Sequence, residues 1–234
     1  MITHPKRDPA TQDPARATAA ARDEMVHEQL LRRGISDERV LQAMAKVPRE
    51  RFVAPELAAL AYTDQALKND YGQTISQPYV VARIAELLQL TGSERVLDIG
   101  AGSGYQAAVL AELVPHGRVF AIERIAELAD RARERLRELR YNVELICQDG
   151  TFGWPEHAPY DAIAVAAASP AVPEPLVAQL KEGGRMVIPI GTEDLQHLMV
   201  VRRQGGRVQA TQDCSVRFVP LLGEHGFPLA PRGG

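Results

Sequence analysis

The segment 95–106, Arg-Val-Leu-Asp-Ile-Gly-Ala-Gly-Ser-Gly-Tyr-Gln, limits the possible folds of this chain more than any other segment. It begins with a short aliphatic run and continues into glycines at alternate positions, Gly100, Gly102 and Gly104, before an alanine-rich helical pattern starts. This order predicts a strand, a tight turn and a helix. Glycine is favoured in such a turn because a Cβ atom would block a ligand that approaches the backbone at the helix N-terminus. The segment therefore predicts a cofactor site.

The glycine spacing decides which cofactors fit this loop. The dinucleotide fingerprint G-x-G-x-x-G requires a third glycine where this chain has Tyr105, and no Gly-Lys-Ser/Thr follows the loop as in a P-loop. The nucleophile pattern G-x-S-x-G also fails around Ser103. The pattern that remains, acidic-Ile-Gly-x-Gly-x-Gly from Asp98 onward, resembles the first motif of the Rossmann-like methyltransferases that use S-adenosylmethionine. In that class the loop meets the methionine end of the cofactor.

A second acidic residue ends the next apolar run, 119–122. This residue is Glu123, which follows Gly104 by 19 positions. A carboxylate at the tip of the second strand can accept hydrogen bonds from both ribose hydroxyls of a nucleoside cofactor. NAD carries an adenosine ribose as well, so Glu123 does not separate the two cofactors, and the glycine spacing is what favours S-adenosylmethionine.

Charge and composition narrow the function classes further. The chain of 234 residues has a net charge of −3, which gives no general basis for nucleic-acid binding. It contains no apolar run long enough to span a bilayer and no secretion signal at its N-terminus. Its two cysteines form no CxxC pair and its six histidines form no HExxH motif, so neither a disulfide framework nor a metal site is indicated. We therefore expect a cytoplasmic monomer without a metal, a membrane association or a nucleic-acid partner.

The pattern along the chain predicts one domain, 19–226, between a flexible tail at 1–18 and a frayed C-terminus at 227–234. Its first part, 19–90, is expected to form an N-terminal helical layer and to carry a substrate motif. The second part, 91–226, is expected to form the cofactor-binding sheet.

The helical layer should contain two helices. The first covers 19–31, and the second follows Ser36, whose hydroxyl is expected to cap it, and ends at Pro48. Beyond the layer, apolar runs alternate with helical patterns, which predicts a Rossmann-like α/β fold with a central, mostly parallel seven-stranded sheet and helices on both faces. Cys147 is expected in the core of its strand. Strands are predicted at 96–99, 119–122, 143–147, 161–165, 185–190, 198–203 and 216–219.

The segment before the glycine loop is more specific than the loop itself. Residues 72–78 read Gly-Gln-Thr-Ile-Ser-Gln-Pro and precede an apolar helical run. They resemble the signature of the protein-L-isoaspartate O-methyltransferases, repair enzymes that methylate the α-carboxylate of isoaspartyl residues. The resemblance covers the chain from roughly residue 28 to residue 222. Its other matching segments are 47–53, 102–108, 180–191 and 216–221.

This resemblance implies the reaction, the cofactor and the site residues. The chain is expected to transfer a methyl group from S-adenosyl-L-methionine to isoaspartyl proteins and peptides, and the methyl ester then leads through a succinimide back to an aspartyl residue. The serine of the motif, Ser76, is implied to act in catalysis together with Thr74, whereas spacing alone favours a helix N-cap role for Ser76. The residues implied to bind the cofactor are Gln77, Asp98, Gly100, Gly102, Gly104, Glu123, Gln148 and Asp149.

Two positions depart from the family pattern. Gln148 replaces the first glycine of the Gly-Asp-Gly element that meets the adenine, and 67–71 replace the Leu-Pro-Ile-Gly that often precedes the motif. The second departure borders the expected substrate entrance, so it affects the transfer of substrate specificity more than that of the fold. Two alternatives stay open here. One is a methyltransferase of the same fold with another substrate, and the other is a non-catalytic module that binds the cofactor or a partner.

Overall fold

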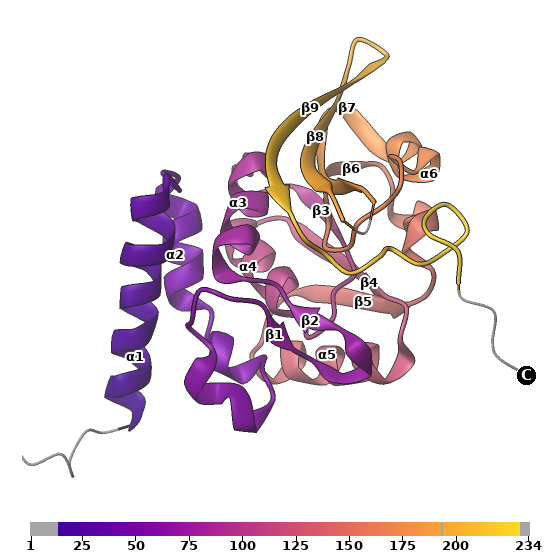
Figure 1. Cartoon of the computed structure of the whole chain (residues 1–234). Helices are drawn as coiled ribbons and strands as arrows, with labels where there is room; N and C mark the ends of the chain where they lie inside the picture. The colour runs from indigo at the N-terminus through magenta and orange to yellow at the C-terminus, as the bar shows by residue number, and fades with distance from the viewer. Residues whose placement is uncertain (1–13, 193, 230–234) are drawn as a thin grey trace, which may run out of the picture.

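The computed structural model describes residues 14–192 and 194–229 (Figure 1). The first thirteen residues of the expected tail and the end of the chain, 230–234, lie outside the described residues. None of the described helices is long and apolar enough to cross a membrane.

A seven-stranded sheet forms the centre of the protein (Figure 1). Its strands are β3 (Arg95–Ile99), β4 (Arg118–Glu123), β5 (Val143–Cys147), β6 (Tyr160–Val165), β7 (Leu180–Gly191), β8 (Gln196–Gln204) and β9 (Arg207–Val216). Their order in space is β5-β4-β3-β6-β7-β8-β9. The first five strands in this order run parallel, and β8 and β9 are antiparallel additions. The expected mostly parallel seven-stranded sheet is therefore confirmed.

The chain changes direction across the sheet at β3. β4 and β5 lie on one side of this strand, whereas β6 and β7 add to the other side. Ligands of open α/β sheets bind beyond the carboxyl ends of the strands at such a switch point, because the connecting loops diverge there. The glycine loop 100–104 follows β3 directly, so the fold places it at this point.

Apolar side chains of the strands alternate between two cores, one on each face of the sheet. In β3, Val96 packs into the first core, whereas Leu97 and Ile99 pack into the second. Helices therefore contribute to both faces, as expected. The first core receives α3 (Pro78–Leu88), α4 (Tyr105–Leu113) and α5 (Ala126–Glu138), and the second receives the short α6 (Glu174–Ala178).

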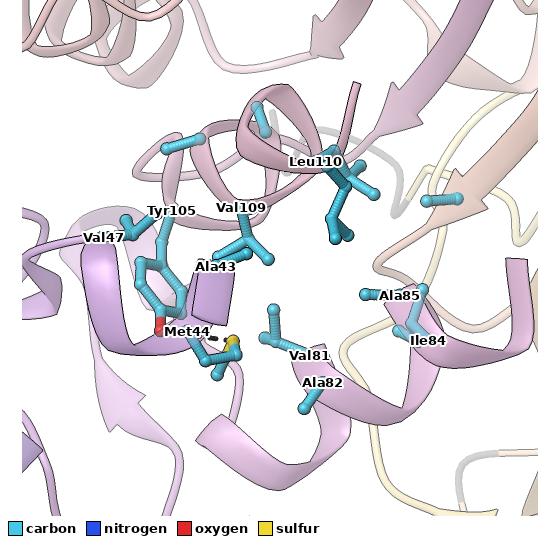
Figure 2. Packing of buried hydrophobic residues seen from close by; sticks show 14 of the residues in the cluster. Ala43, Met44, Val47, Val81, Ala82, Ile84, Ala85, Tyr105, Val109 and Leu110 are labelled. Carbon is cyan, nitrogen blue, oxygen red and sulfur yellow. Dashed lines mark hydrogen bonds between the residues drawn. The ribbon is translucent and has the colours of Figure 1, made fainter. Parts of the chain in front are cut away.

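The N-terminal helical layer packs on α3 and α4 (Figure 1). In Figure 2, Met44 lies beside Tyr105 at the start of α4, and the Tyr105 hydroxyl donates to the Met44 sulfur at 3.7 Å. Because α4 begins at the glycine loop, the layer supports the helix on which the loop rests. Its elements are α1 (Pro14–Glu24), a π-helical turn (Met25–Leu30), a 3-10 turn (Leu31–Arg33) and α2 (Glu38–Lys46).

Two boundaries in this layer differ from the prediction. α1 already includes residues 14–18, which were expected in the flexible tail. Asp37 caps α2 instead of Ser36, because its carboxylate accepts the N–H of Arg39 at 2.9 Å. Ser36 is engaged elsewhere, since its own N–H donates to the Glu86 carboxylate at 2.6 Å.

The prediction of the last strand was wrong. β9 starts immediately after the Gly205–Gly206 turn, with Gln204 opposite Arg207, so the edge strand occupies 207–216. Its side chains are mostly polar and exposed, so the sequence of this strand contains no apolar run that would predict it. The segment 217–222 leaves the sheet instead and runs beside the loop after β6, where Ala168 donates to the carbonyl of Val219 at 2.9 Å.

Further local differences concern β5, β7 and the motif before α3. Cys147 is exposed at the end of β5 instead of buried, because β5 is an edge strand. β7 begins at Leu180, before the predicted start at residue 185. Leu180 pairs with Tyr160 of β6, the register of the pairing then shifts, and β7 continues through Gly183 and Gly184. The motif itself forms a small separate sheet, in which β1 (Leu67–Lys68) pairs antiparallel with β2 (Thr74–Ile75).

Candidate active site

The glycine loop turns sharply between β3 and α4. Its first residues are fixed because the N–H groups of Gly100 and Ala101 donate to the carbonyl of Ile122 at 2.9 and 3.0 Å. Gly100 and Gly102 have positive φ angles of 82° and 53°, which residues with a side chain rarely adopt. Gly104 is the N-cap residue of α4. The loop can therefore hold its backbone close to a ligand at the N-terminus of this helix.

Glu123 ends β4 beside this loop and is buried. One carboxylate oxygen accepts the N–H of Gly102 at 2.9 Å, and the other accepts the N–H of Ile125 at 2.9 Å. A carboxylate has about four acceptor positions, so each oxygen keeps capacity for another donor. The side chain thus fixes the loop and can still accept the ribose hydroxyls that the sequence predicts it to bind.

Asp98 lies under the loop and has no exposed surface. The amide of Gln106 donates to its Oδ1 at 2.7 Å, but its Oδ2 is buried without a hydrogen-bond partner within the described residues. Burial raises the pKa of Asp98, the Gln106 amide lowers it and the Glu123 carboxylate raises it, and the resulting pKa is about 7. An unpaired buried acceptor of this kind is expected to attract a cationic group.

A cavity opens beyond the carboxyl ends of β3 and β4, and we call it the cofactor cavity. Gly150 forms part of its wall, where a Cβ atom would stand only 2.6 Å from a methyl carbon of Ile99. The wall therefore requires glycine at this position. Other residues that line the cavity are Thr74, Gly100, Gly102, Glu123 and 219–222.

Gln148 and Asp149 stand next to this wall without lining the cavity. The Gln148 amide donates to a nearby backbone carbonyl at 2.7 Å. The Asp149 carboxylate accepts the N–H of Thr151 at 2.8 Å and the N–H of Glu224 at 3.0 Å. Asp149 therefore ties the C-terminal segment to the wall, and Gly150 is the residue of this element that reaches the cavity.

Thr74 and Ser76 lie opposite the glycine loop. A narrow cavity, which we call the acceptor pocket, is lined by both residues together with Gly100 and Gly102. Within the part of the chain that the structure describes, neither hydroxyl makes a hydrogen bond to another protein group. The N-cap role that spacing favours for Ser76 was wrong, because Pro78 is the first residue of α3 and the cap position falls on the next residue after Ser76. Both hydroxyls are thus available to a ligand.

A larger groove, which we call the outer groove, is lined by Thr74 and Ser76 and by the segment 214–219. Gln77 belongs to this groove, where its amide donates to the Asp64 carboxylate at 2.6 Å. The structure therefore does not bring Gln77 to the cofactor cavity, in which the sequence placed it. Thr74 lines the cofactor cavity, the acceptor pocket and the outer groove, so these three spaces meet at its side chain.

Two further residues of the site were not identified as candidates from the sequence. Gln106 reaches Asp98 and lines the acceptor pocket, and its signal was a polar residue inside an otherwise apolar helix. Gln73 lines the cofactor cavity beside Thr74.

The arrangement fits S-adenosylmethionine by charge and shape. The cofactor is a sulfonium with an ammonium group at its methionine end, and Asp98 offers a buried oxygen without a partner near that end of the loop. Its ribose needs acceptors, which Glu123 retains. Gly100 and Gly150 line the cavity without a Cβ atom, so the cofactor can approach the backbone closely at both positions.

Comparison with known proteins agrees with this geometry. Residues 20–226 match the model of the protein-L-isoaspartate (D-aspartate) O-methyltransferase family. The chain is 56% identical over 209 residues to protein-L-isoaspartate O-methyltransferase 2 of Pelobacter propionicus, a match that covers 88% of this chain and 92% of the relative. It is 56% identical over 205 residues to the protein-L-isoaspartate O-methyltransferase of Aeropyrum pernix, covering 86% and 79% of the two chains.

Solved structures give the same result. A protein-L-isoaspartate O-methyltransferase superposes with a TM-score of 0.79 at 31% identity, covering 88% of this chain and 67% of that chain. A Plasmodium falciparum protein described as belonging to the same enzyme class, solved with S-adenosyl-L-homocysteine, gives a TM-score of 0.72 at 28% identity and covers 85% and 96%. The matches in sequence and in fold span most of the chain. The chain therefore belongs to the protein-L-isoaspartate (D-aspartate) O-methyltransferase family.

Proposed function

We propose that this chain repairs proteins by transferring a methyl group from S-adenosyl-L-methionine to the α-carboxylate of L-isoaspartyl residues, which Ser76 and Thr74 hold in place. Family membership supplies the reaction and the methyl donor: the protein is a protein-L-isoaspartate O-methyltransferase. The observation that carries the residue roles is the position of Thr74, at which the cofactor cavity, the acceptor pocket and the outer groove meet. A methyl donor in the first space and a polypeptide in the last would face each other across the two hydroxyls.

The acceptor carboxylate needs orientation and no general base. A carboxyl group with a pKa near about 4 is already ionised at neutral pH, so no proton has to be removed before the attack. The free hydroxyls of Ser76 and Thr74 donate to one carboxylate oxygen and leave the other oxygen to react. Transfer requires the reacting atoms within about 3 to 3.5 Å in line, and such alignment is what two fixed donors provide.

The cofactor side holds the donor and keeps the site dry. When bound, S-adenosyl-L-methionine supplies an electrophilic methyl group on a sulfonium that leaves as a neutral thioether. Asp98 and the glycine loop bind its charged end, and Glu123 accepts the ribose hydroxyls. Exclusion of water from this buried region lowers the local dielectric constant. The attraction between the substrate carboxylate and the sulfonium of the cofactor is therefore stronger there than in water.

The outer groove is the proposed site of the polypeptide. Val80 and Phe218 give it apolar walls, and Arg217 adds an exposed cation at its edge. The backbone nitrogen of the following residue then attacks the methyl ester, expels methanol and closes a succinimide, whose hydrolysis returns aspartyl residues. A cytoplasmic location, a monomeric state and the absence of a nucleic-acid partner stay predictions from the sequence.

The test is methyl transfer from labelled S-adenosyl-L-methionine to an isoaspartyl peptide, with the matching aspartyl peptide as a control. We expect label on the isoaspartyl form alone. Ser76→Ala should lower kcat by about 10- to 100-fold, since a hydrogen bond to a charged group contributes about 1.5–3 kcal/mol. Affinity for S-adenosyl-L-homocysteine should stay within about twofold, because Ser76 does not line the cofactor cavity.

A matched variant, Ser93→Ala, removes an exposed serine hydroxyl outside the three spaces and should leave both quantities unchanged. Equal losses of kcat and cofactor affinity in Ser76→Ala would contradict the role of Ser76. Label on neither peptide, with cofactor binding intact, would discard the repair reaction and favour a non-catalytic module.

A further inference from the structure

Arg49 is a buried arginine with no role in the site as described so far. It begins a 3-10 turn (Arg49–Arg51), and none of its surface is exposed to solvent. Its Nε donates to the carbonyl of Ala61 at 2.7 Å, and its Nη2 donates to the carbonyl of Ser76 at 2.8 Å. One guanidinium group therefore holds a residue that lines the acceptor pocket.

The charge of Arg49 lacks an acidic partner within the described residues. The adjacent carboxylate, Glu50, is paired with Arg22 at 3.1 Å. The Nη1 atom is buried without a hydrogen-bond partner in the described chain, and the guanidinium carbon lies 4.7 Å from the centroid of the Tyr105 ring. Burying a cation without a carboxylate is costly. A local conflict of this kind is typical of a functional requirement rather than of packing alone.

We propose that Arg49 is a positioning residue for methyl transfer, which holds the backbone of Ser76 so that the Ser76 hydroxyl meets the substrate carboxylate. This inference rests on the proposed function of Ser76. The motif needs such a support because β2 pairs with β1 through two residue pairs, and Ser76 lies just beyond that short ladder. The planar guanidinium fork fixes two acceptors in one geometry, which the single ammonium group of a lysine does not.

Arg49 also contacts the cofactor side of the site. Tyr105, whose ring lies under the guanidinium, follows Gly104 and begins α4. Figure 2 shows the Tyr105 ring held beside Val47 and Met44 of the N-terminal layer. The same side chain thus touches the residue that presents the acceptor hydroxyl and the residue that follows the glycine loop, so both halves of the site share one support.

The experiment is a double-mutant cycle on kcat with the isoaspartyl peptide, comparing wild type, Arg49→Lys, Ser76→Ala and the double variant. If Arg49 acts through the Ser76 hydroxyl, Arg49→Lys lowers kcat by about tenfold, the cost of losing one charge-assisted hydrogen bond. The same change then has little effect once the hydroxyl is gone, and the double variant stays within about twofold of Ser76→Ala. A role in folding alone predicts multiplied losses instead.

Arg39→Lys is the matched control. Arg39 also joins two backbone carbonyls, of Leu90 and Leu113, but it lies outside the site. This change should leave kcat within about twofold of wild type in either background, because no site residue depends on Arg39. Affinity for S-adenosyl-L-homocysteine and the melting temperature, measured for every variant, establish the folded fraction.

Several results would overturn the inference while leaving the repair reaction intact. One is an active wild type in which the losses of kcat from the two single variants multiply in the double variant. The others are a normal kcat in Arg49→Lys and a normal kcat in Ser76→Ala. Should Arg49→Lys fail to fold, Arg49→Gln takes its place in the cycle, since its amide NH2 group can still donate but carries no charge. Failure of both variants to fold assigns Arg49 to stability and also overturns the proposal. A wild type without activity on the isoaspartyl peptide instead contradicts the proposed function itself.

Discussion

The two sides of the active site are built differently. On the cofactor side, the glycine loop and Glu123 stand at the ends of neighbouring buried strands, and N–H groups of the loop donate to the Ile122 carbonyl and the Glu123 carboxylate at 2.9 to 3.0 Å. On the acceptor side, Thr74 belongs to a two-residue strand outside the main sheet and Ser76 follows that strand directly, and their hydroxyls bond to no described protein group. The first side is fixed by regular structure, and the second is held by individual side chains.

Substitutions on the two sides should therefore affect different properties of the enzyme. Substitutions on the cofactor side should alter stability and cofactor affinity together, because the same groups hold the fold and the ligand. Substitutions on the acceptor side should alter turnover with little effect on stability, since few backbone interactions depend on them.

The largest effect is expected at Asp98, where burial raises the carboxyl pKa from 3.8 to about 7. Because the folded protein holds this proton more tightly than the unfolded chain, the stability contribution is complete below about pH 4 and is lost as the pH rises through about 7. The shift corresponds to about 4 kcal/mol. Asp98→Asn cannot ionise, so its stability relative to wild type should increase by roughly 3 kcal/mol between pH 5 and pH 8. Urea unfolding without ligand at both pH values measures this difference, and parallel curves for the two proteins would contradict the prediction.

The next effect is expected at Glu123. Glu123→Ala removes the acceptor of two backbone N–H groups and the proposed ribose acceptor, so affinity for S-adenosyl-L-homocysteine should fall by about 100-fold, or about 3 kcal/mol. Isothermal titration measures the affinity. Glu127→Ala, which removes an exposed carboxylate in the first turn of α5, is the matched control and should bind normally. Unchanged binding in Glu123→Ala would remove this residue from the cofactor site.

Most of the cofactor side could be predicted from the sequence because its determinants are local. A strand, three glycines and a strand-end carboxylate lie within 30 residues, and each follows its own rule of turn or sheet geometry. The exception is the element at 148–150. Its position was predicted, but the structure turns the side chains of Gln148 and Asp149 toward backbone groups and leaves Gly150 in the wall.

The resemblance to the family located the residues of the acceptor side, but local sequence patterns did not predict how their side chains are oriented. Spacing favoured an N-cap role for Ser76, whereas the structure fixes its carbonyl through Arg49, 27 residues earlier in the chain. Gln77 was expected at the cofactor, but it bonds with Asp64 on the outer groove. Contacts between residues far apart in sequence decide these orientations, and no periodicity encodes them.

A smaller effect is expected at Thr74, on the acceptor side. Thr74→Val keeps the shape of the side chain and removes its hydroxyl, so kcat should fall by about tenfold, or about 1.4 kcal/mol, near the lower limit for a hydrogen bond to a charged group. The melting temperature should not change, and the affinity for S-adenosyl-L-homocysteine should stay within about twofold, because valine keeps the part of the cofactor-cavity wall that Thr74 forms. Thr63→Val provides the control, since the Thr63 hydroxyl donates to the Leu60 carbonyl away from the site. A loss of cofactor affinity equal to the loss of kcat would show that the two sides are not separable at this residue.

The smallest effect is expected where the two sides meet on the surface. Asp70, in the connection between β1 and β2, forms an ion pair with Arg131 of α5, and both side chains are more than half exposed. Water and salt screen such a pair, so it contributes roughly 0 to 1 kcal/mol. Asp70→Asn should therefore change the free energy of unfolding by less than about 1 kcal/mol and the KM for the isoaspartyl peptide by less than about twofold. The measurement is repeated with Arg131→Gln and with the double variant, at low and high salt. A coupling well above this range, or a large rise in KM, would mean that the acceptor side is fastened to the cofactor side by this pair. Its support would then come from the surface rather than from buried groups such as Arg49.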